Sequence, residues 1–161
     1  YLAMLDWAIE QTDTPVVVRT PGGKVVHATR PVATDYSDIG YEIVIKGERV
    51  AIIAAGDFMQ LGEKAVALMR NRGLNPTLIN PRILSQIDTV TLDTLRDYDT
   101  IITLEDNCLD GGMGQKIAAY LGSAPVKVHT LGLPKAFPNR FRASDLLTSC
   151  GLTPEAIYEK L

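Results

Sequence analysis

The stretch VAIIAA at residues 50–55 decides the fold, because it is apolar at every position. A strand with one face in water alternates apolar and polar residues, whereas an unbroken apolar run is typical of a strand that is buried on both faces of a sheet. Immediately before it, YEIVI at residues 41–45 has the composition of another strand. Lys46-Gly47-Glu48 can form a tight turn between the two. We therefore expect residues 41–45 and 50–55 to form an antiparallel pair.

Apolar strands alternate with amphipathic helices through the rest of the chain. Further strands are expected at 75–80, 100–105 and 126–131, and helices at 57–71, 90–98, 114–121, 143–151 and 153–161. Gly73 is placed to cap the first of these helices, and Thr153-Pro154 has the residue types that begin a helix. Such alternation indicates βαβ units. The sequence therefore predicts an α/β fold with three layers, α/β/α, around a mixed, mostly parallel sheet.

Residues 1–40 do not join this pattern. Residues 1–11 have helical spacing and PVVVR at 15–19 predicts a buried strand, but Pro and Gly dominate from Thr20 to about Tyr41. We expect 1–40 to be the end of a preceding α/β domain plus a linker, and 41–161 to be a domain of its own. No capping residue precedes the first helix, as if the helix continued from earlier sequence. We therefore expect domains upstream of it. Their loss would expose apolar side chains, namely Leu2, Leu5, Ile9 and Val16–Val18.

Composition excludes several classes of protein. The 161 residues carry a net charge of −3 with no basic run, so nucleic-acid binding has no electrostatic basis. No apolar run approaches the roughly 20 residues of a membrane helix, and the first residues do not resemble a signal peptide. Cys108 and Cys150 are isolated, which favours a reducing, cytoplasmic location. Neither cysteine has metal-ligand spacing with His27 or His129, so no metal site is expected.

The segment LEDNCLDGGMGQKIAAYL at residues 104–121 is the sharpest local feature. An apolar strand ends at Glu105 and Asp106, and a glycine-rich loop then opens a helix. A helix N-terminus of this kind can hold an anion. However, the G-G-x-G spacing matches neither a dinucleotide motif nor a phosphate loop, and two carboxylates would repel a phosphate. We therefore favour an architectural loop whose acidic residues cap the helix or form ion pairs.

One arginine and two acidic residues suggest a second candidate site. Arg82 follows the strand at 75–80, Asp88 precedes a helix, and Glu105 ends the next strand. The carboxyl ends of parallel strands form the usual binding crevice, so Arg82 and Glu105 could bind a ligand together. Alternatively, the two side chains could form an ion pair that orders two loops. We favour the ion pair.

Several single residues elsewhere also have a functional and a structural interpretation. Arg19 at the end of PVVVR could bind a phosphate with its planar guanidinium, or could bond nearby carbonyl groups. Cys108 has acidic neighbours, which disfavour a reactive thiolate. We expect His27 to be exposed, His129 to be packed in a strand, and Trp7 and Phe58 to be packing residues. The residues alone predict no catalytic set.

Five segments resemble the 1-deoxy-D-xylulose-5-phosphate synthases of the transketolase superfamily. LEDNCLDGGMG resembles their VEEN-x-x-x-GG-x-G segment, INPRILSQID their NARFVKPLD, and PVVVRTPGG their PVAVRYPRG. TLGLPKAF is similar to their NIGLPDxF, and SCGLTPEAIYEKL to their closing GLD-x-x-x-I stretch. The five follow in the family's order at nearly its spacing, from Pro15 to the end of the chain.

This resemblance implies a homodimeric, three-domain transferase that needs thiamine diphosphate and Mg²⁺. Such synthases condense pyruvate with glyceraldehyde 3-phosphate and release carbon dioxide, for isoprenoid and thiamine biosynthesis. Residues 41–161 would be the transketolase-type C-terminal domain, and residues 1–40 the end of the pyrimidine-binding domain. Arg19 matches the first arginine of RYPRG, which implies binding of the substrate phosphate. The chain has no residue that matches a catalytic, cofactor or metal position, so it is expected to be inactive alone.

Departures from the family pattern keep other functions open. Thr20 replaces the tyrosine of RYPRG, Gly22-Gly23 lacks its second arginine, and FPNRF at 137–141 replaces FIPHG. A transketolase-like enzyme that transfers ketol groups between sugar phosphates is one alternative. A free-standing α/β module that binds a ligand at the 105–114 loop is another.

Overall fold

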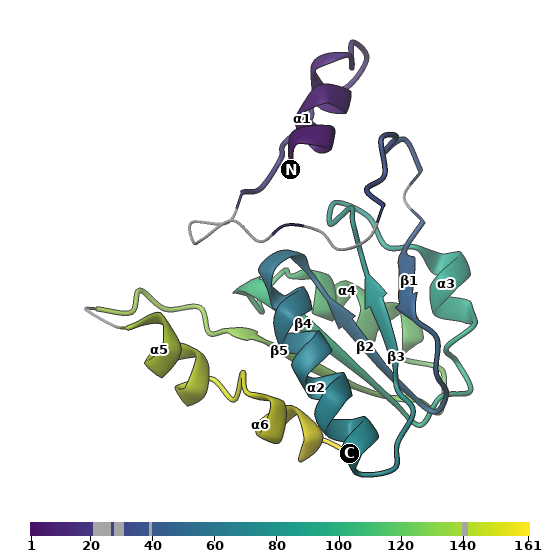
Figure 1. Cartoon of the computed structure of the whole chain (residues 1–161), viewed down its shortest axis with the longest axis vertical. Helices are drawn as coiled ribbons and strands as arrows, with labels where there is room; N and C mark the ends of the chain where they lie inside the picture. The colour runs from purple at the N-terminus through teal and green to yellow at the C-terminus, as the bar shows by residue number, and fades with distance from the viewer. Residues whose placement is uncertain (21–26, 28–30, 39, 140–141) are drawn as a thin grey trace. The chain divides into compact units, whose positions relative to one another are not determined.

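The computed structural model describes residues 1–20, 27, 31–38, 40–139 and 142–161. The chain divides into two compact units, unit 1 at Tyr1–Ile39 and unit 2 at Gly40–Leu161. Figure 1 labels the elements of both units.

Unit 2 is built on a five-stranded sheet with the order β1-β3-β2-β4-β5. Its strands are β1 (Glu42–Ile45), β2 (Val50–Ala54), β3 (Thr77–Asn80), β4 (Thr100–Cys108) and β5 (Lys127–Leu133). The pairs β2–β3, β2–β4 and β4–β5 are parallel, and β1–β3 is antiparallel. The mixed, mostly parallel sheet predicted from the sequence is confirmed.

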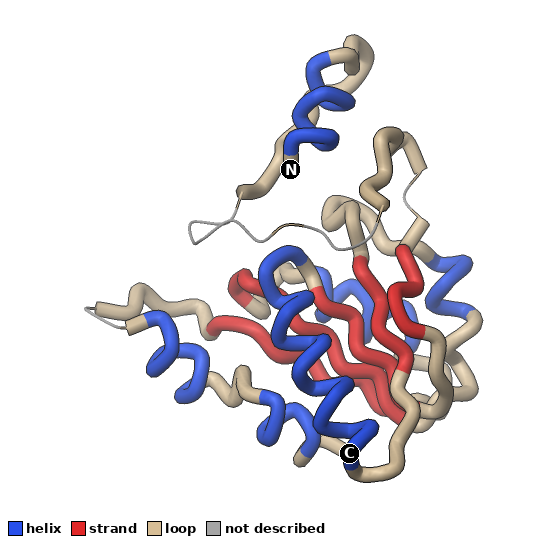
Figure 2. Tube along the Cα trace, in the orientation of Figure 1, coloured by secondary structure: helices blue, strands red, loops and turns tan. Residues whose placement is uncertain are grey.

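Helices cover both faces of this sheet, which confirms the three-layer α/β/α architecture (Figure 2). They are η1 (Gly56–Phe58), α2 (Met59–Asn71), α3 (Thr89–Asp93), α4 (Met113–Leu121), α5 (Ala143–Ser149) and α6 (Pro154–Tyr158). The expected caps are present: Gly73 has a φ of 82° just after α2, and the Thr153 side chain accepts from Ala156 N with Pro154 next to it. None of the helices in the described part of the chain is long and apolar enough to cross a membrane.

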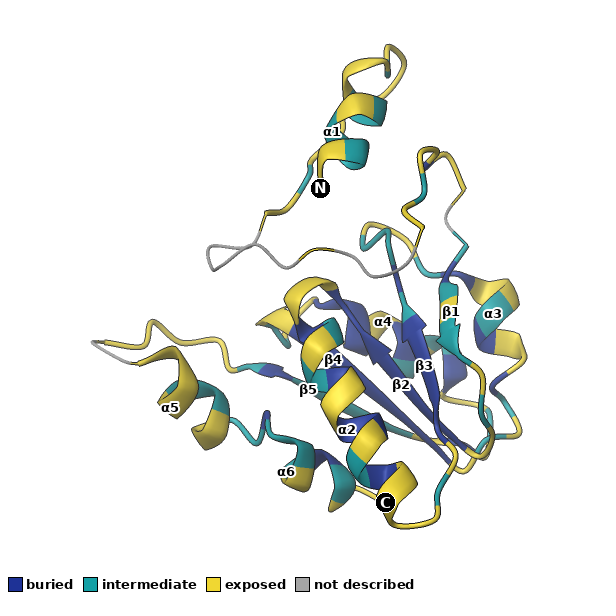
Figure 3. Ribbon diagram, viewed as in Figure 1, coloured by how far each residue is buried: buried dark blue, intermediate teal, exposed yellow. Residues whose placement is uncertain are grey.

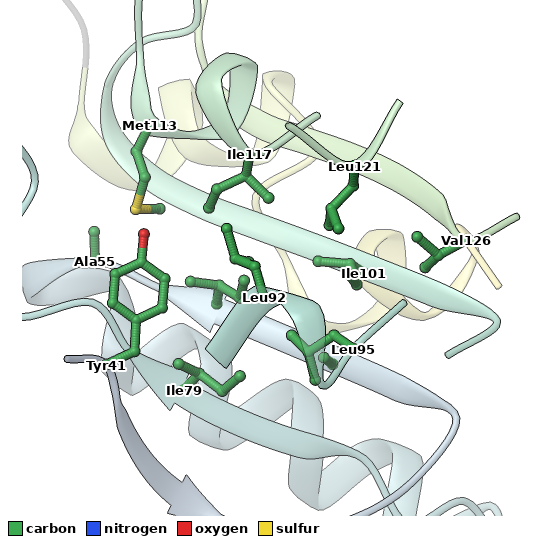
Figure 4. Close-up of a cluster of buried hydrophobic side chains, with 12 residues drawn as sticks. Tyr41, Ala55, Ile79, Leu92, Leu95, Ile101, Met113, Ile117, Leu121 and Val126 are labelled. Carbon is green, nitrogen blue, oxygen red and sulfur yellow. The ribbon is translucent and has the colours of Figure 1, made fainter. Parts of the chain in front are cut away.

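Strand β2 lies at the centre of the fold, buried at all five positions (Figure 3). Successive side chains of a strand point to opposite faces. Ala51 and Ile53 accordingly pack with α3 and α4, whereas Ile52 and Ala54 pack with α2 and α6. Figure 4 shows the first of these clusters, in which Leu92, Ile117 and Leu121 converge on the sheet. VAIIAA is therefore apolar throughout because it supplies both cores.

The expected hairpin between residues 41–45 and 50–55 is wrong in its pairing. β1 is antiparallel, but its partner is β3, and β2 takes β3 and β4 as neighbours. The turn at 46–49 instead crosses the start of β3: Gly47 N donates to Thr77 Oγ1 at 3.0 Å and Glu48 N to Asn75 O at 2.8 Å. A Cβ at Gly47 would lie 2.5 Å from Pro76 O, so glycine permits this crossing.

This order suits the burial of the two strands. An edge strand forms hydrogen bonds on one side only and tolerates exposed side chains, and Ile43 of β1 is 49% exposed. The wholly buried β2 needs hydrogen-bond partners on both sides. Placing β1 at the edge and β2 inside satisfies both requirements.

The described residues of unit 1 include the expected helix, α1 (Leu2–Ile9). Trp7 packs edge-to-face on Tyr36, with ring centroids 5.9 Å apart. Of the apolar side chains expected to be exposed, Leu2, Ile9, Val16 and Val17 are exposed, whereas Leu5 and Val18 are half-buried.

The strand predicted at 15–19 is absent, because these residues have no regular structure. A strand needs a neighbour for its N–H and C=O groups, and the described residues of unit 1 include no other strand. Much of the expected linker from Thr20 to Tyr41 lies outside the described residues.

Candidate functional site

Glu105 is the most deeply buried charged residue at the carboxyl ends of the parallel strands, with 3% of its surface exposed. Its two oxygens accept hydrogen bonds from the first backbone N–H groups of α4: Oε2 from Met113 N and Oε1 from Gly114 N, each at 2.9 Å. A helix N-terminus favours a negative charge. Glu105 therefore occupies the place that an external anion would take, which confirms the expected capping role.

Glycines allow this approach. Gly111 has a φ of 76°, which favours glycine, and its N–H donates to Gln115 Oε1 at 2.8 Å. A Cβ at Gly112 would lie 2.5 Å from both Glu105 oxygens. A Cβ at Gly114 would clash with Thr103 Oγ1. Glycines are therefore required in this loop, because α4 packs closely against β4 and against the Glu105 side chain that caps it.

Arg82 and Glu105 do not form the pair considered from the sequence, either as a ligand site or as an ion pair. Arg82 Nη2 instead donates to Gly40 O at 3.0 Å, and its buried Nε has no hydrogen-bond partner. Both Glu105 oxygens are engaged by α4. Arg82 follows β3 and Glu105 lies within β4, and β2 separates these two strands in the sheet.

Asp88 is a helix cap with a second task. Its Oδ1 accepts from Val90 N at 3.0 Å and Thr91 N at 3.1 Å, at the start of α3. Its Oδ2 accepts from Thr91 Oγ1 and, at 2.9 Å, from Tyr41 N. Burial raises the pKa of Asp88, but the hydrogen bonds to Thr91, Tyr41 and Val90 outweigh it and leave the pKa below its ordinary value. The contact with Tyr41 was not expected, since no local pattern links residues 47 positions apart.

Tyr41 contributes a buried hydroxyl that the sequence did not indicate. Its side chain is 7% exposed, and its oxygen has no hydrogen-bond partner. The hydroxyl points toward Met113 within an apolar cluster (Figure 4). This burial raises the pKa of Tyr41 to about 12.

The remaining candidates belong to several separate elements of the two units. Arg19 is exposed in unit 1, and His27 is exposed as expected. His129 is half-buried in β5, and Cys108 is half-buried at the end of β4, opposite Leu133. Both cysteines are free thiols. Phe58 is buried, as expected of a packing residue. In the described ranges, no group of three or more His, Cys, Asp or Glu residues could hold a metal ion.

Solved structures support the fold. A split-gene transketolase, described as an inactive β4 tetramer, matches 80% of this chain and 42% of its own, with a TM-score of 0.68 and 22% identity. A transketolase from Campylobacter jejuni matches 76% of this chain and 18% of its own, with a TM-score of 0.56 and 11% identity. At these identities the likeness concerns the fold alone.

Sequence comparisons give the family. 1-Deoxy-D-xylulose-5-phosphate synthase from Clostridium botulinum (strain Eklund 17B / Type B) is 31% identical over 96% of this chain and 25% of its own length. The synthase from Pseudoalteromonas translucida (strain TAC 125) is 34% identical over 91% of this chain and 24% of its own. The chain thus spans about a quarter of the length of the curated relatives it matches. The family described as "Transketolase, C-terminal domain" matches residues 40–157. The chain belongs to the family of transketolase C-terminal domains.

Proposed function

We propose that this chain is the C-terminal part of a 1-deoxy-D-xylulose-5-phosphate synthase. The complete enzyme would condense pyruvate with glyceraldehyde 3-phosphate and release carbon dioxide. The observation that carries the proposal is the similarity to synthases of this name along 96% of the chain, at 31% identity. The match of residues 40–157 to the transketolase C-terminal domain supports it.

Within that enzyme, unit 2 would be structural and unit 1 would be the end of the pyrimidine-binding domain. The acidic group and the helix N-terminus most suited to bind a ligand in unit 2 satisfy each other, because Glu105 caps α4. The glycine loop therefore offers little to a small molecule, which argues against a free-standing module that binds a ligand at residues 105–114.

Thiamine diphosphate and its Mg²⁺ do not fit the described residues of this chain. Those residues supply no cluster of three carboxylate, imidazole or thiolate ligands. We propose that upstream domains of the homodimer bind both, in the cytoplasm.

Arg19 is the one residue of this chain that we propose at the substrate. Its exposed guanidinium is suited to the phosphate of glyceraldehyde 3-phosphate, because its planar fork can donate two parallel hydrogen bonds. Replacing Arg19 by Lys would keep the charge but lose the bidentate geometry. In the complete enzyme we expect Arg19→Lys to raise KM for glyceraldehyde 3-phosphate about tenfold, the equivalent of one charge-assisted hydrogen bond, without changing KM for pyruvate.

The decisive experiment is an assay of the complete polypeptide that contains these residues. Pyruvate-dependent release of carbon dioxide in the presence of glyceraldehyde 3-phosphate is the expected result. Ketol transfer between sugar phosphates, without carbon dioxide release, would instead identify the transketolase-like alternative. The 161 residues alone should show neither reaction, and calorimetry should detect no binding of thiamine diphosphate to them.

A further inference from the structure

Asp110-Gly111 is the one Asp-Gly dipeptide in the sequence, which has no Asn-Gly dipeptide. It lies in the turn between β4 and α4, where the Asp110 side chain is 61% exposed. Gly111 is exposed too, and a Cβ there would meet no described atom within 4 Å beyond the neighbouring residues. An aspartate before a glycine is especially prone to ring closure, because glycine has no side chain to shield its own nitrogen. The turn is therefore open to this reaction and to water.

Ring closure needs only the residues of the turn and water. Gly111 N attacks the side-chain carboxyl carbon of Asp110, so that a nitrogen–carbon bond forms and the carbon–hydroxyl bond of the protonated carboxyl group breaks. The hydroxyl group and the proton of the nitrogen leave as water. Water then opens the ring: attack on the side-chain carbon restores aspartate, whereas attack on the main-chain carbonyl carbon gives isoaspartate. No oxidant, reductant or further reagent takes part.

One hydrogen bond opposes the first step. Gly111 N donates to Gln115 Oε1 at 2.8 Å. The nitrogen has to release its proton in order to attack, and donation to Gln115 keeps that proton in place. Lys135 Nζ lies 3.9 Å from Asp110 Oδ2, but both side chains are largely exposed, and an exposed ion pair contributes little. Gln115 is therefore the stronger of the two restraints on the turn.

The product would disturb the cap of α4. Isoaspartate lengthens the main chain by one carbon atom between residues 110 and 111. The next residue, Gly112, packs so closely that a Cβ there would lie 2.5 Å from both Glu105 oxygens. Those oxygens accept from Met113 N and Gly114 N, each at 2.9 Å. A longer main chain just before Gly112 would displace it from this fit.

We propose that Asp110 is a site of spontaneous isoaspartate formation, that Gln115 slows the reaction, and that the product weakens the Glu105 cap of α4. The inference goes beyond the proposed function, because it depends on the turn and not on any substrate. The class of partner that recognises such a site is a methyltransferase that acts on the isoaspartyl carboxylate.

Peptide mapping of the 161-residue chain after incubation at mildly acidic pH tests the site. The expected product has the mass of the original peptide, elutes apart from it, and accepts a methyl group from an isoaspartyl methyltransferase. We expect Gln115→Ala to form it about fivefold faster, the equivalent of one hydrogen bond. Gln115→Glu retains an acceptor oxygen and should react at close to the wild-type rate. Lys135→Ala is the matched control and should change the rate less than about twofold.

Unfolding separates the hydrogen bond from other effects of the substitution. In urea strong enough to unfold the chain, wild type and Gln115→Ala should react at the same rate, because the bond to Gln115 belongs to the folded protein. Absence of isoaspartate at residue 110 in both folded chains would overturn the site. Equal rates in the two folded chains would overturn the control by Gln115.

Amide hydrogen exchange tests the effect on the cap. After the modified chain has been separated from the unmodified one, its Met113 and Gly114 amides should exchange about tenfold faster, because each loses one hydrogen bond. The amides of Val90 and Thr91, which Asp88 caps on α3, are the control and should exchange equally in both forms. Equal protection of Met113 and Gly114 in the two forms would overturn the effect on the cap.

Discussion

The Glu105 carboxylate lies against Gly112 so closely that a Cβ on the glycine would be 2.5 Å from each carboxylate oxygen. The same oxygens accept from the N–H groups of Met113 and Gly114. The acid and the glycine therefore depend on each other: the cap can reach α4 only because Gly112 has no side chain. This explains the acidic strand end and the glycine-rich loop as a single structural unit.

Replacing Glu105 by Gln should destabilise the protein by about 2 kcal/mol, because a buried N–H would then face an amide NH₂ in place of a carboxylate oxygen. Chemical denaturation measures this change. Glu63→Gln is the control, since Glu63 is exposed on α2 and its replacement should change the free energy of unfolding by less than about 0.5 kcal/mol. Equal stability of the two variants would contradict the capping role.

Gly112→Ala should cost about 1–3 kcal/mol, because the new methyl group forces Glu105 out of its capping position. Gly122 provides the comparison. It ends α4 with a φ of −59°, and a Cβ there meets only carbonyl oxygens at 3.4 Å. Gly122→Ala should therefore be nearly neutral in thermal unfolding. A similar loss in both variants would contradict a specific role for the contact between Gly112 and Glu105.

Tyr41→Phe should leave stability unchanged or raise it by about 1 kcal/mol, because it removes a buried hydroxyl that has no hydrogen-bond partner. Tyr98→Phe should lower it by a similar amount, since the Tyr98 hydroxyl contacts Thr77 Oγ1 and Gly47 O, each at 3.1 Å. Urea denaturation of the two variants under the same conditions makes the comparison. Destabilisation by Tyr41→Phe would show that the hydroxyl has a bound partner, such as an ordered water.

Asp88 should make stability depend on pH in the acid range. Its pKa in the folded protein is below the ordinary value of 3.8, because the hydrogen bonds from Thr91, Tyr41 and Val90 outweigh the effect of burial. Its contribution is therefore present above that value and is lost as the pH falls through the lower folded pKa. The difference in unfolding free energy between wild type and Asp88→Asn should be constant near neutrality and shrink below about pH 4. A difference independent of pH would contradict this.

Local patterns were sufficient for the order of elements in unit 2. The apolar run 50–55 predicted a strand buried on both faces, and the structure buries Val50–Ala54 between two helical layers. The capping of α4 by an acidic residue was also expected from the adjacent strand, loop and helix. These predictions succeeded because side-chain burial and helix capping leave a signature within a few residues of sequence.

Pairing could not be predicted in the same way. A turn at Lys46-Gly47-Glu48 suits a hairpin, yet residues 46–49 cross the start of β3, 30 positions away, and β1 pairs there. PVVVR at 15–19 has the composition of a strand, yet the described residues of unit 1 include no neighbouring strand for it. Arg82 follows β3 and Glu105 lies in β4, the next strand along the chain, yet β2 separates those strands in the sheet.

The sequence by itself determined the α/β class, the succession of strands and helices in unit 2, and the resemblance to a transketolase-type synthase. Only the tertiary structure decided that β1 lies at the edge beside β3, that Arg82 binds Gly40, and that Asp88 joins Tyr41 to α3. The physical reason is the range of the interactions. Periodicity records how one segment is buried, whereas a hydrogen-bond partner is chosen by the folding of residues that are distant in the chain.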